Sequence, residues 1–313
     1  MSKEKSLILD NIVYFFFRLL TFLVRVLPLS VGYALADIAS WFFYHLDFKH
    51  TGRAVTHILH SGIRTDRKEA KKIARESFRH LMKVFIEIVK FDQIVTRENI
   101  RDYIRVADDP LSQRLLNPET SYQISLATAH LGNWELAGGA NSVLSGIPVT
   151  SIMRPLNNEK IGNYIYNHRM SFDHKTVSKK KGLRPLLTAM NEGHNIAIVA
   201  DQHASSNEGV EVTFFGHPAR AHATPALLHL RSGIPIAMLY LVRLDNHFHF
   251  EYRCEDEFVY TPTGDKQKDI QEITQRYTEI IERAVRKYPE QWLWCHRRWL
   301  DCNRKCKSSS DKK

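Results

Sequence analysis

The sequence predicts an α/β protein with a central, mostly parallel sheet flanked by helices, preceded by a membrane-associated helical extension at the N-terminus. Beyond about residue 120, short strand-type runs alternate with helix-compatible runs, which is typical of a sheet covered by helices on both faces. The chain has 313 residues, of which 43% are hydrophobic, so it can bury a large core. The first 46 residues are instead dominated by apolar and aromatic side chains.

Residues 12–29 form an apolar run interrupted by Arg18 and Arg25. The run is too short to span a bilayer comfortably once these two charges are counted. The two arginines are seven residues apart and share one face of a helix, and Pro28 is expected to end that helix. A second apolar helix is predicted over residues 31–46.

Three interpretations of this N-terminal region stay open: an amphipathic helix at the membrane interface, an uncleaved anchor, or a buried core helix. No small-residue cleavage site follows the run, so a signal peptide is not expected. The many aromatic residues, and Lys3 and Lys5 ahead of them, favour membrane contact. We therefore predict membrane-contacting helices over residues 1–60, an α/β domain over residues 61–306 and a disordered tail over residues 307–313.

The α/β part begins with a helix that starts at Thr65–Asp66 and keeps apolar residues at three- and four-residue steps to Val89. Residues 99–119 are polar and are predicted as a linker with short elements. The later strands are predicted at residues 122–126, 148–153, 175–178, 195–200, 210–215, 235–242 and, as an edge strand, 247–253. The later helices are predicted at residues 136–144, 157–172, 183–191, 224–231 and 269–288.

The chain carries 44 Lys and Arg against 34 Asp and Glu, a net charge of +10. This excess suits an anionic partner such as a membrane surface, a phosphorylated lipid or an acidic protein. Zinc-finger, RNA-binding and basic-heptad signatures are missing from the sequence, so nucleic acid is not an expected partner.

Cysteines and histidines do not indicate a metal or a disulfide framework. The four cysteines contain no Cys-x2-Cys pair, which favours free thiols in a reducing compartment: Cys254, Cys295, Cys302 and Cys306. A group of histidines lacks helical His-x3-His pairing and a carboxylate at ligand spacing: His203, His217, His222 and His229. No metal site is predicted.

The candidate site centres on His130-Leu131-Gly132-Asn133-Trp134-Glu135. His130 follows a predicted strand, and Glu135 falls in the first turn of the next helix, where open α/β sheets place their chemistry. On a regular helix, five residues rotate by about 140°, so His130 and Glu135 meet only if the chain turns at Gly132. If they meet, Glu135 orients the imidazole and His130 serves as a base. A half-buried histidine beside a surface glutamate is the alternative.

This His-x4-Glu stretch resembles the catalytic block of the lysophospholipid acyltransferase superfamily. It is most similar to the late acyltransferases of lipid A biosynthesis, the lauroyl and myristoyl transferases. Further blocks agree in order over roughly residues 11–300: residues 153–157, 182–184, 201–202, 209–216 and 292–299. In one detail the chain departs from the family, which commonly has lysine where Leu300 stands.

The resemblance implies acyl transfer without a covalent intermediate and without a cofactor or metal. His130 would be the general base and Glu135 would fix its tautomer. Backbone N–H groups near Gly132 and Asn133, or an arginine, would stabilise the oxyanion. These two residues also count among the expected substrate-binding residues.

Four further residues are expected near the substrate. Arg154 follows a predicted strand, and Arg184 begins a predicted helix. Both suit phosphate recognition, and the alternative is that they only make the surface soluble. Asp201 and Gln202 end a buried strand on the rim expected for His130, where Asp201 would hold a basic side chain or bind the acceptor. Three tryptophans with two arginines either line the membrane interface or belong to a packed C-terminal segment: Trp292, Trp294, Trp299, Arg297 and Arg298.

The resemblance also implies partners and a location. The donor would be an acyl-carrier-protein thioester and the acceptor a phosphorylated glycolipid, the lipid A precursor of lipopolysaccharide biosynthesis. The location would be the cytoplasmic face of the bacterial inner membrane. Two alternatives stay open, namely an acyltransferase for another glycolipid or a glycerolipid, and a non-catalytic, membrane-associated lipid-binding protein of the same fold.

Overall fold

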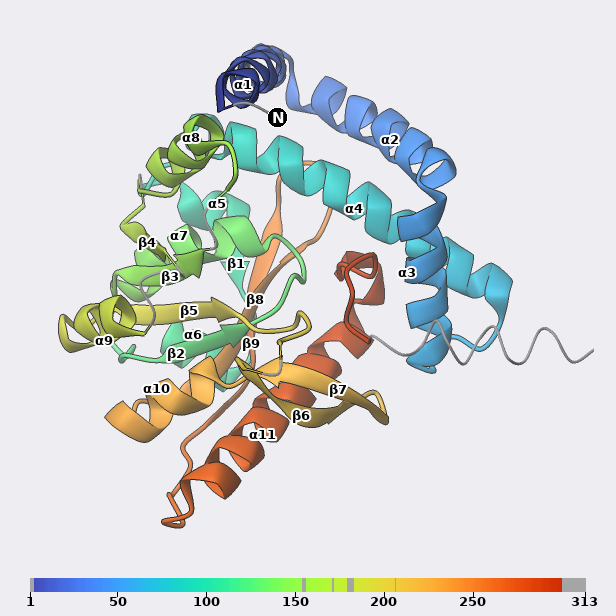
Figure 1. The fold of residues 1–313 in the computed structure, drawn as a ribbon. Coiled ribbons are helices and arrows are strands. Elements are labelled where there is room, and N and C mark those ends of the chain that lie inside the picture. Colours follow the sequence, from blue (N-terminus) through green and yellow to red (C-terminus); the bar gives the residue numbers. More distant parts are fainter. Residues whose placement is uncertain (1–2, 154–155, 171, 179–182, 206, 300–313) are drawn as a thin grey trace, which may run out of the picture.

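The computed structural model describes residues 3–153, 156–170, 172–178, 183–205 and 207–299. Its centre is a seven-stranded sheet in which every neighbouring pair is parallel except β8 and β9 (Figure 1). Across the sheet the strands are β1 (Ile104–Val106), β9 (Phe250–Phe258), β8 (Ile236–Arg243), β2 (Ser125–Thr128), β5 (Asn195–Val199), β3 (Val149–Met153) and β4 (His174–Ser178). The predicted α/β class with a mostly parallel sheet is confirmed.

Helices cover both faces of this sheet. Strand β8 shows why, because its side chains alternate between two cores. Leu239 and Leu241 pack with residues of α7, whereas Met238 and Tyr240 pack with residues of α11. The covering helices are α7 (Trp134–Ser145), α8 (Glu159–Met170), α9 (Arg184–Asn191), α10 (Thr224–Ser232) and α11 (Lys266–Lys287).

Several elements differ from the prediction. β1 pairs with the outer side of β9, so β9 is not the edge strand that the sequence indicates. A three-residue strand is too short to show alternation, which is why the segment resembles a linker. α5 (Ile100–Tyr103) and α6 (Pro110–Leu115) also lie within residues 99–119, where short elements are predicted. The elements that the prediction omits are α3 (Phe48–His60), the 3-10 helix η2 (Pro289–Gln291) and β7 (His217–His222), the hairpin partner of β6 (Gly209–Phe214).

The long helix α4 (Arg67–Ile94) carries the N-terminal helices (Figure 1). Its start is capped by Asp66, whose carboxylate accepts from the N–H groups of Lys68 and Glu69. α1 (Lys3–Val26) is tied to it by an ion pair of 2.8 Å between Arg25 and Asp92. α2 (Leu29–Leu46) is tied to it by Asp37, whose carboxylate accepts two bonds of 2.7 Å from Arg79.

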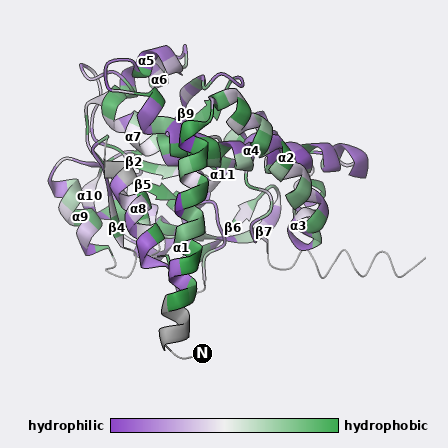
Figure 2. Ribbon diagram, turned by 90° about the horizontal axis from the view of Figure 1, so that it is seen from above, coloured by the Kyte–Doolittle hydropathy of each residue, from purple (hydrophilic) through white to green (hydrophobic). Residues whose placement is uncertain are grey.

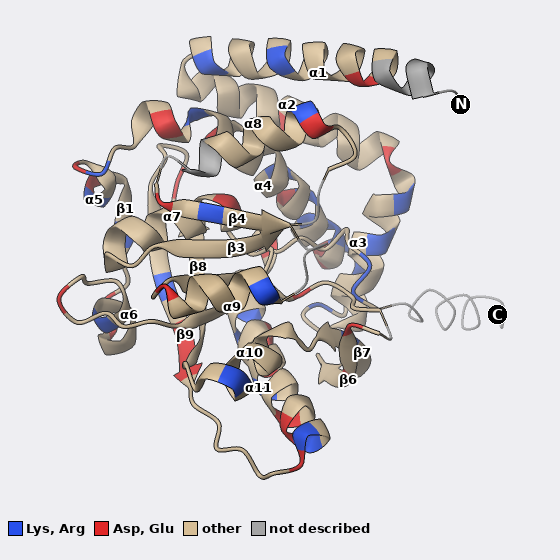
Figure 3. Ribbon diagram, turned by 60° about the vertical axis from the view of Figure 1, so that its left-hand side comes forward, with Lys and Arg blue, Asp and Glu red and all other residues tan. Residues whose placement is uncertain are grey.

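The outer faces of these N-terminal helices are apolar. Figure 2 shows α1 crossing the molecule with hydrophobic residues along much of its length, and Figure 3 shows few charges on it. None of the helices that the structure describes is long and apolar enough to cross a bilayer. The exposed apolar residues, which we call the N-terminal apolar surface, are Ile8, Leu9, Ile12, Val13, Phe15, Phe16, Leu19, Leu20, Phe22, Leu23 and Val26 of α1, Val31, Leu35, Ile38, Trp41, Phe42, Phe43 and Leu46 of α2, and Phe48 of α3.

Candidate active site

The site forms where two neighbouring strands end. β2 and β5 are parallel and in register from Ser125 beside Ile196 to Thr128 beside Val199. The pairing continues beyond the strands, because the Ala200 N–H donates to Thr128 O at 2.8 Å. His130 and Asp201 each lie two residues beyond the end of their strand and therefore meet at the same edge of the sheet.

Asp201 orients the imidazole of His130. Its Oδ1 lies 2.8 Å from His130 Nδ1, and its Oδ2 accepts from the backbone N–H of His130 at 2.9 Å. The indole N–H of Trp292 donates to the same Oδ2 at 2.8 Å. Glu135 was expected to orient the imidazole, so this part of the prediction is corrected: Asp201 occupies that place, because the adjacent strand ends bring it to Nδ1.

This contact defines the tautomer. A carboxylate only accepts, so Nδ1 of His130 carries the proton and Nε2 presents a lone pair. The side-chain amide of Gln202 lies 3.3 Å from that Nε2. The histidine side chain is 18% exposed and the Asp201 side chain is fully buried, so Nε2 is the end of the pair within reach of a ligand.

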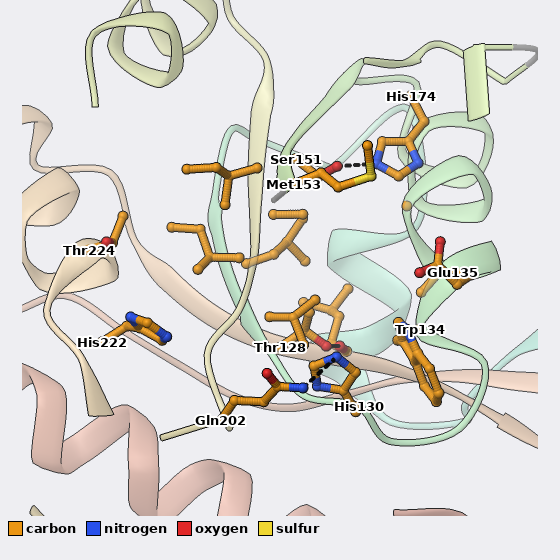
Figure 4. Close-up of a pocket in the computed structure, with 18 of the residues that line it drawn as sticks. Thr128, His130, Trp134, Glu135, Ser151, Met153, His174, Gln202, His222 and Thr224 are labelled. Carbon is orange, nitrogen blue, oxygen red and sulfur yellow. Dashed lines mark hydrogen bonds between the residues drawn. The ribbon is translucent and has the colours of Figure 1, made fainter. Parts of the chain in front are cut away.

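A cleft with a volume of about 650 Å³ opens beside His130. This volume is in the range of small-molecule sites. Figure 4 shows His130, Trp134, Glu135 and Gln202 around it. Apolar side chains of the sheet and of α7 form much of the remaining lining, namely Leu126, Ala137, Ile152, Met153, Ala197, Ile198, Val199 and Leu239. The cleft thus combines a base with an apolar wall.

The electrostatics favour a basic imidazole. Burial alone would lower the pKa of His130, but the Asp201 carboxylate and, after it, the charge of Glu135 outweigh burial and raise that pKa above its ordinary value. Burial likewise works against ionisation of Asp201, yet the contacts with His130 and Trp292 hold its pKa below the ordinary value. Glu135 thus acts on His130 through its charge, while Asp201 acts through charge and direct hydrogen bonds.

Gly132 and Asn133 shape the turn between His130 and α7. Gly132 has φ +60°, and a Cβ there would lie 2.0 Å from Leu241 O. Its N–H donates to Gln291 O at 3.0 Å, and the Asn133 N–H donates to Leu241 O at 2.7 Å. Both N–H groups therefore donate within the fold and do not point to an oxyanion. A contribution from another N–H group near this turn, or from an arginine, stays a prediction. Asn133 is fully buried, and its side-chain oxygen caps α7 by accepting from Leu136 N–H. In this geometry its side chain does not reach a substrate.

Arg184 is not among the residues that line the cleft beside His130. Arg184 is exposed at the start of α9 and lines a different, shallow depression with Thr150, Lys175 and Thr188. Its expected role near the substrate therefore stays a prediction. Arg154 lies outside the described residues, as does the predicted tail at residues 307–313.

The C-terminal aromatic residues belong to the core. Trp292 and Trp294 are fully buried and Trp299 is 4% exposed, so the packed-segment interpretation holds over the membrane-interface one. Among the residues that the structure describes, no group of three or more His, Cys, Asp and Glu side chains is arranged to hold a metal ion. Cys254 and Cys295 are free thiols.

Together, the fold and the site define an α/β protein with a histidine–aspartate pair at the carboxyl edge of a mostly parallel sheet, facing an apolar-walled cleft. A sequence model of the family described as bacterial lipid A biosynthesis acyltransferase matches residues 1–301. The chain belongs to this family.

Two curated kinds of relative are similar to part of the chain. A phosphatidylinositol mannoside acyltransferase of Mycobacterium tuberculosis is 26% identical over 178 residues, which are 56% of this chain and 54% of that protein. The enzyme of the same name from Mycolicibacterium smegmatis is 27% identical over 179 residues, 56% of each chain. The lipid A biosynthesis palmitoleoyltransferase of Escherichia coli is 23% identical over 178 residues, 56% of this chain and 55% of that protein. The chain thus spans about half the length of the curated relatives it matches.

Proposed function

We propose that this protein is an acyltransferase that moves a fatty acyl chain from an acyl-carrier-protein thioester to a hydroxyl of a lipid A precursor. The observation that carries the proposal is the His130–Asp201 pair, whose free Nε2 lies at an apolar-walled cleft. In acyl transfer, the base accepts the proton of the acceptor hydroxyl, and the apolar wall accommodates the acyl chain beside it. Family membership supports the same chemistry.

In the proposed reaction the acceptor hydroxyl occupies the place near Nε2 where the Gln202 amide now lies. Its oxygen attacks the thioester carbonyl as His130 Nε2 takes the hydroxyl proton, and Asp201 stabilises the resulting imidazolium. The tetrahedral intermediate then collapses, the C–S bond breaks, and the thiolate leaves with the proton from His130. The products are the ester and the free carrier thiol, so no serine or cysteine nucleophile takes part.

Glu135 has a proposed supporting role. Its charge raises the pKa of His130 without occupying Nδ1, which is bound to Asp201. It also lines the cleft, so it faces the reacting groups. We infer that Glu135 stabilises the imidazolium electrostatically as the proton arrives.

The proposed partners are an acidic carrier protein, a phosphorylated acceptor and a lipid surface. The net charge of +10 complements all three. Soluble proteins rarely expose large contiguous apolar areas, and the N-terminal apolar surface gathers 19 side chains on α1, α2 and the start of α3. We propose that this surface rests in the membrane interface, at the cytoplasmic face of the inner membrane.

A second acceptor class has its own support. The mycobacterial relatives carry the name phosphatidylinositol mannoside acyltransferase, and their identity to this chain is at the same low level as that of the lipid A enzyme. A mannosylated phospholipid and a lipid A precursor have two features in common: both are phosphorylated lipids, and both carry sugar hydroxyls. Transfer to such a glycolipid is therefore the alternative to transfer to lipid A.

The decisive experiment combines purified protein with an acyl-carrier-protein thioester and, separately, an acyl-coenzyme A. Each donor is offered with a lipid A precursor, with a phosphatidylinositol mannoside and with no acceptor, while thiol release and acylated lipid are measured. We expect release that depends on an acceptor and is lost in His130→Ala by about 10²–10⁴-fold. His247→Ala, a change at an exposed loop histidine, is the matched control and should retain activity. Lipid binding without turnover by the wild type, or full turnover by a folded His130→Ala protein, would overturn the proposal.

A further inference from the structure

A buried polar network lies behind the catalytic turn, on the side away from the cleft. At its centre is Glu87 of α4, which is fully buried. Its carboxylate accepts from Tyr33 at 2.8 Å, from the Asn133 side-chain amide at 2.7 Å and from Arg243 Nη2 at 2.9 Å, and Arg243 Nε donates to it as well. A carboxylate offers about four lone-pair positions, so Glu87 is fully occupied.

The network reaches the turn a second time through His80. Arg243 Nη1 lies 2.6 Å from His80 Nδ1, and His80 Nε2 lies 3.0 Å from Gly132 O. A carbonyl only accepts, so Nε2 carries the proton and Nδ1 accepts from Arg243. Burial, and the neighbouring guanidinium, lower the pKa of His80 well below its ordinary value, which agrees with this neutral form.

The turn is thereby held from two directions. Glu87 holds the Asn133 side chain, whose oxygen caps α7, and His80 holds the carbonyl of Gly132. Gly132 follows His130 by two residues, so any rotation of this turn moves the imidazole relative to Asp201 and to the cleft. Side-chain placement within a fraction of an ångström matters at such sites, because misplacement by 1 Å can cost about 10²-fold in rate.

We propose that His80, Glu87 and Arg243 are positioning residues for the reaction at His130. They form a buried charged clamp that fixes the Gly132–Asn133 turn, and none of the three lines the catalytic cleft. The inference rests on the proposed acyl transfer. It adds that residues of α4 and of the end of β8 keep the turn beside His130 in place. Backbone bonds of Gly132 and Asn133 also hold the turn, and the clamp adds contacts to the carbonyl of Gly132 and to the side chain of Asn133.

His80 permits a sharp test. Glutamine places an oxygen and an N–H group about as far apart as the two ring nitrogens, so His80→Gln retains both an acceptor for Arg243 and a donor for Gly132 O. His80→Phe retains the ring shape and loses both. We expect His80→Phe and Glu87→Gln to lower kcat by about 10²-fold with KM nearly unchanged, and His80→Gln to recover most of that loss.

Tyr33→Phe is the matched control. It removes one buried hydrogen bond to the same carboxylate but none to the turn. We expect it to lower the melting temperature while kcat stays close to that of the wild type. Should His80→Phe fail to fold, Arg243→Lys carries the same expectation, because lysine keeps a charge beside Glu87 but cannot also reach His80.

The kinetic pattern decides the outcome, with every variant assayed at a temperature where it is folded. Folded His80→Phe and Glu87→Gln proteins with normal kcat would overturn the inference, as would losses confined to KM. Losses of kcat that follow melting temperature in all variants, Tyr33→Phe included, would also overturn it. These results leave the proposed function intact as long as His130→Ala is inactive, whereas an active His130→Ala protein refutes the proposed function itself.

Discussion

Asp201 and His130 are 71 residues apart in the sequence, yet Asp201 Oδ1 lies 2.8 Å from His130 Nδ1. A second oxygen of the same carboxylate accepts from the backbone N–H of His130 and from Trp292. The carboxylate is therefore fixed by three donors before any substrate arrives. It presents the base in one tautomer, as a site that must take a proton from a hydroxyl requires.

Replacing Asp201 by asparagine should be severe. The amide can no longer compel Nδ1 to carry the proton, and loss of the analogous carboxylate in a serine protease lowers kcat by about 10⁴-fold through the wrong tautomer. The charge of Asp201 also raises the pKa of His130, so its removal lowers that pKa. Because the base acts unprotonated, the rising limb of kcat/KM against pH should move to lower pH in Asp201→Asn, with a lower plateau. A rising limb that stays in place or moves to higher pH would contradict the assigned pair.

Glu135→Gln should be milder than Asp201→Asn. Glu135 contributes to the raised pKa of His130 through charge alone, after the two contributions of Asp201. We therefore expect a smaller fall in kcat and a smaller shift of the same limb to lower pH. Parallel pH profiles of both variants measure this order. If Glu135→Gln proved the more damaging of the two, Glu135 would be the principal partner of the base in the reacting complex.

The sequence was informative where the signal is local. Alternating strand and helix runs predict the α/β sheet, and the turn residue Gly132 indicates a bend after His130. The partner of His130 could not be assigned in this way, because strand order is not local: β5 lies beside β2, although β3 and β4 come between them in the chain. The sequence correctly predicts that Asp201 lies at the same edge of the sheet as His130. It assigns the orientation of the imidazole to Glu135 instead, because Glu135 is nearer to His130 in the sequence.

The buried network shows a second limit of the sequence. His80 and Glu87 are seven residues apart, so they share one face of α4, within a pattern whose apolar spacing predicts an ordinary core helix. Two polar residues on a core-facing stripe are the available signal. Their purpose depends on Arg243, which ends a strand far along the chain, and no spacing within α4 reveals that partner.

Gly132→Ala tests the turn itself. An L-residue in this left-handed conformation costs roughly 1–2 kcal/mol, and the added Cβ would lie 2.0 Å from Leu241 O, which belongs to a central strand. We expect a marked decrease in the free energy of unfolding, measured in urea. We also expect a loss of activity under conditions where the variant is still folded. Gly62→Ala is the control, since Gly62 has φ +68° with nothing within 4 Å of its added Cβ. Equal effects of the two substitutions would mean that contact with β8 does not constrain the catalytic turn.

The proposed membrane contact can be tested without deleting a helix. Phe15, Phe16 and Phe22 of α1 are 61%, 61% and 62% exposed, so serine at these three positions should remove little packing from the folded protein. A fully buried phenylalanine contributes about 1.5–3 kcal/mol, and partial insertion of three should still change partitioning by at least about tenfold. Co-sedimentation with anionic phospholipid vesicles measures this partitioning. Val259→Ser, at an apolar residue that is 60% exposed but lies outside the N-terminal apolar surface, should bind like the wild type.

Transfer to an acceptor in vesicles should fall in the triple variant, while transfer to a detergent-dispersed acceptor should persist, because His130 and its cleft are unchanged. Undiminished vesicle binding by the triple variant would show that α1 is not the face that meets the lipid.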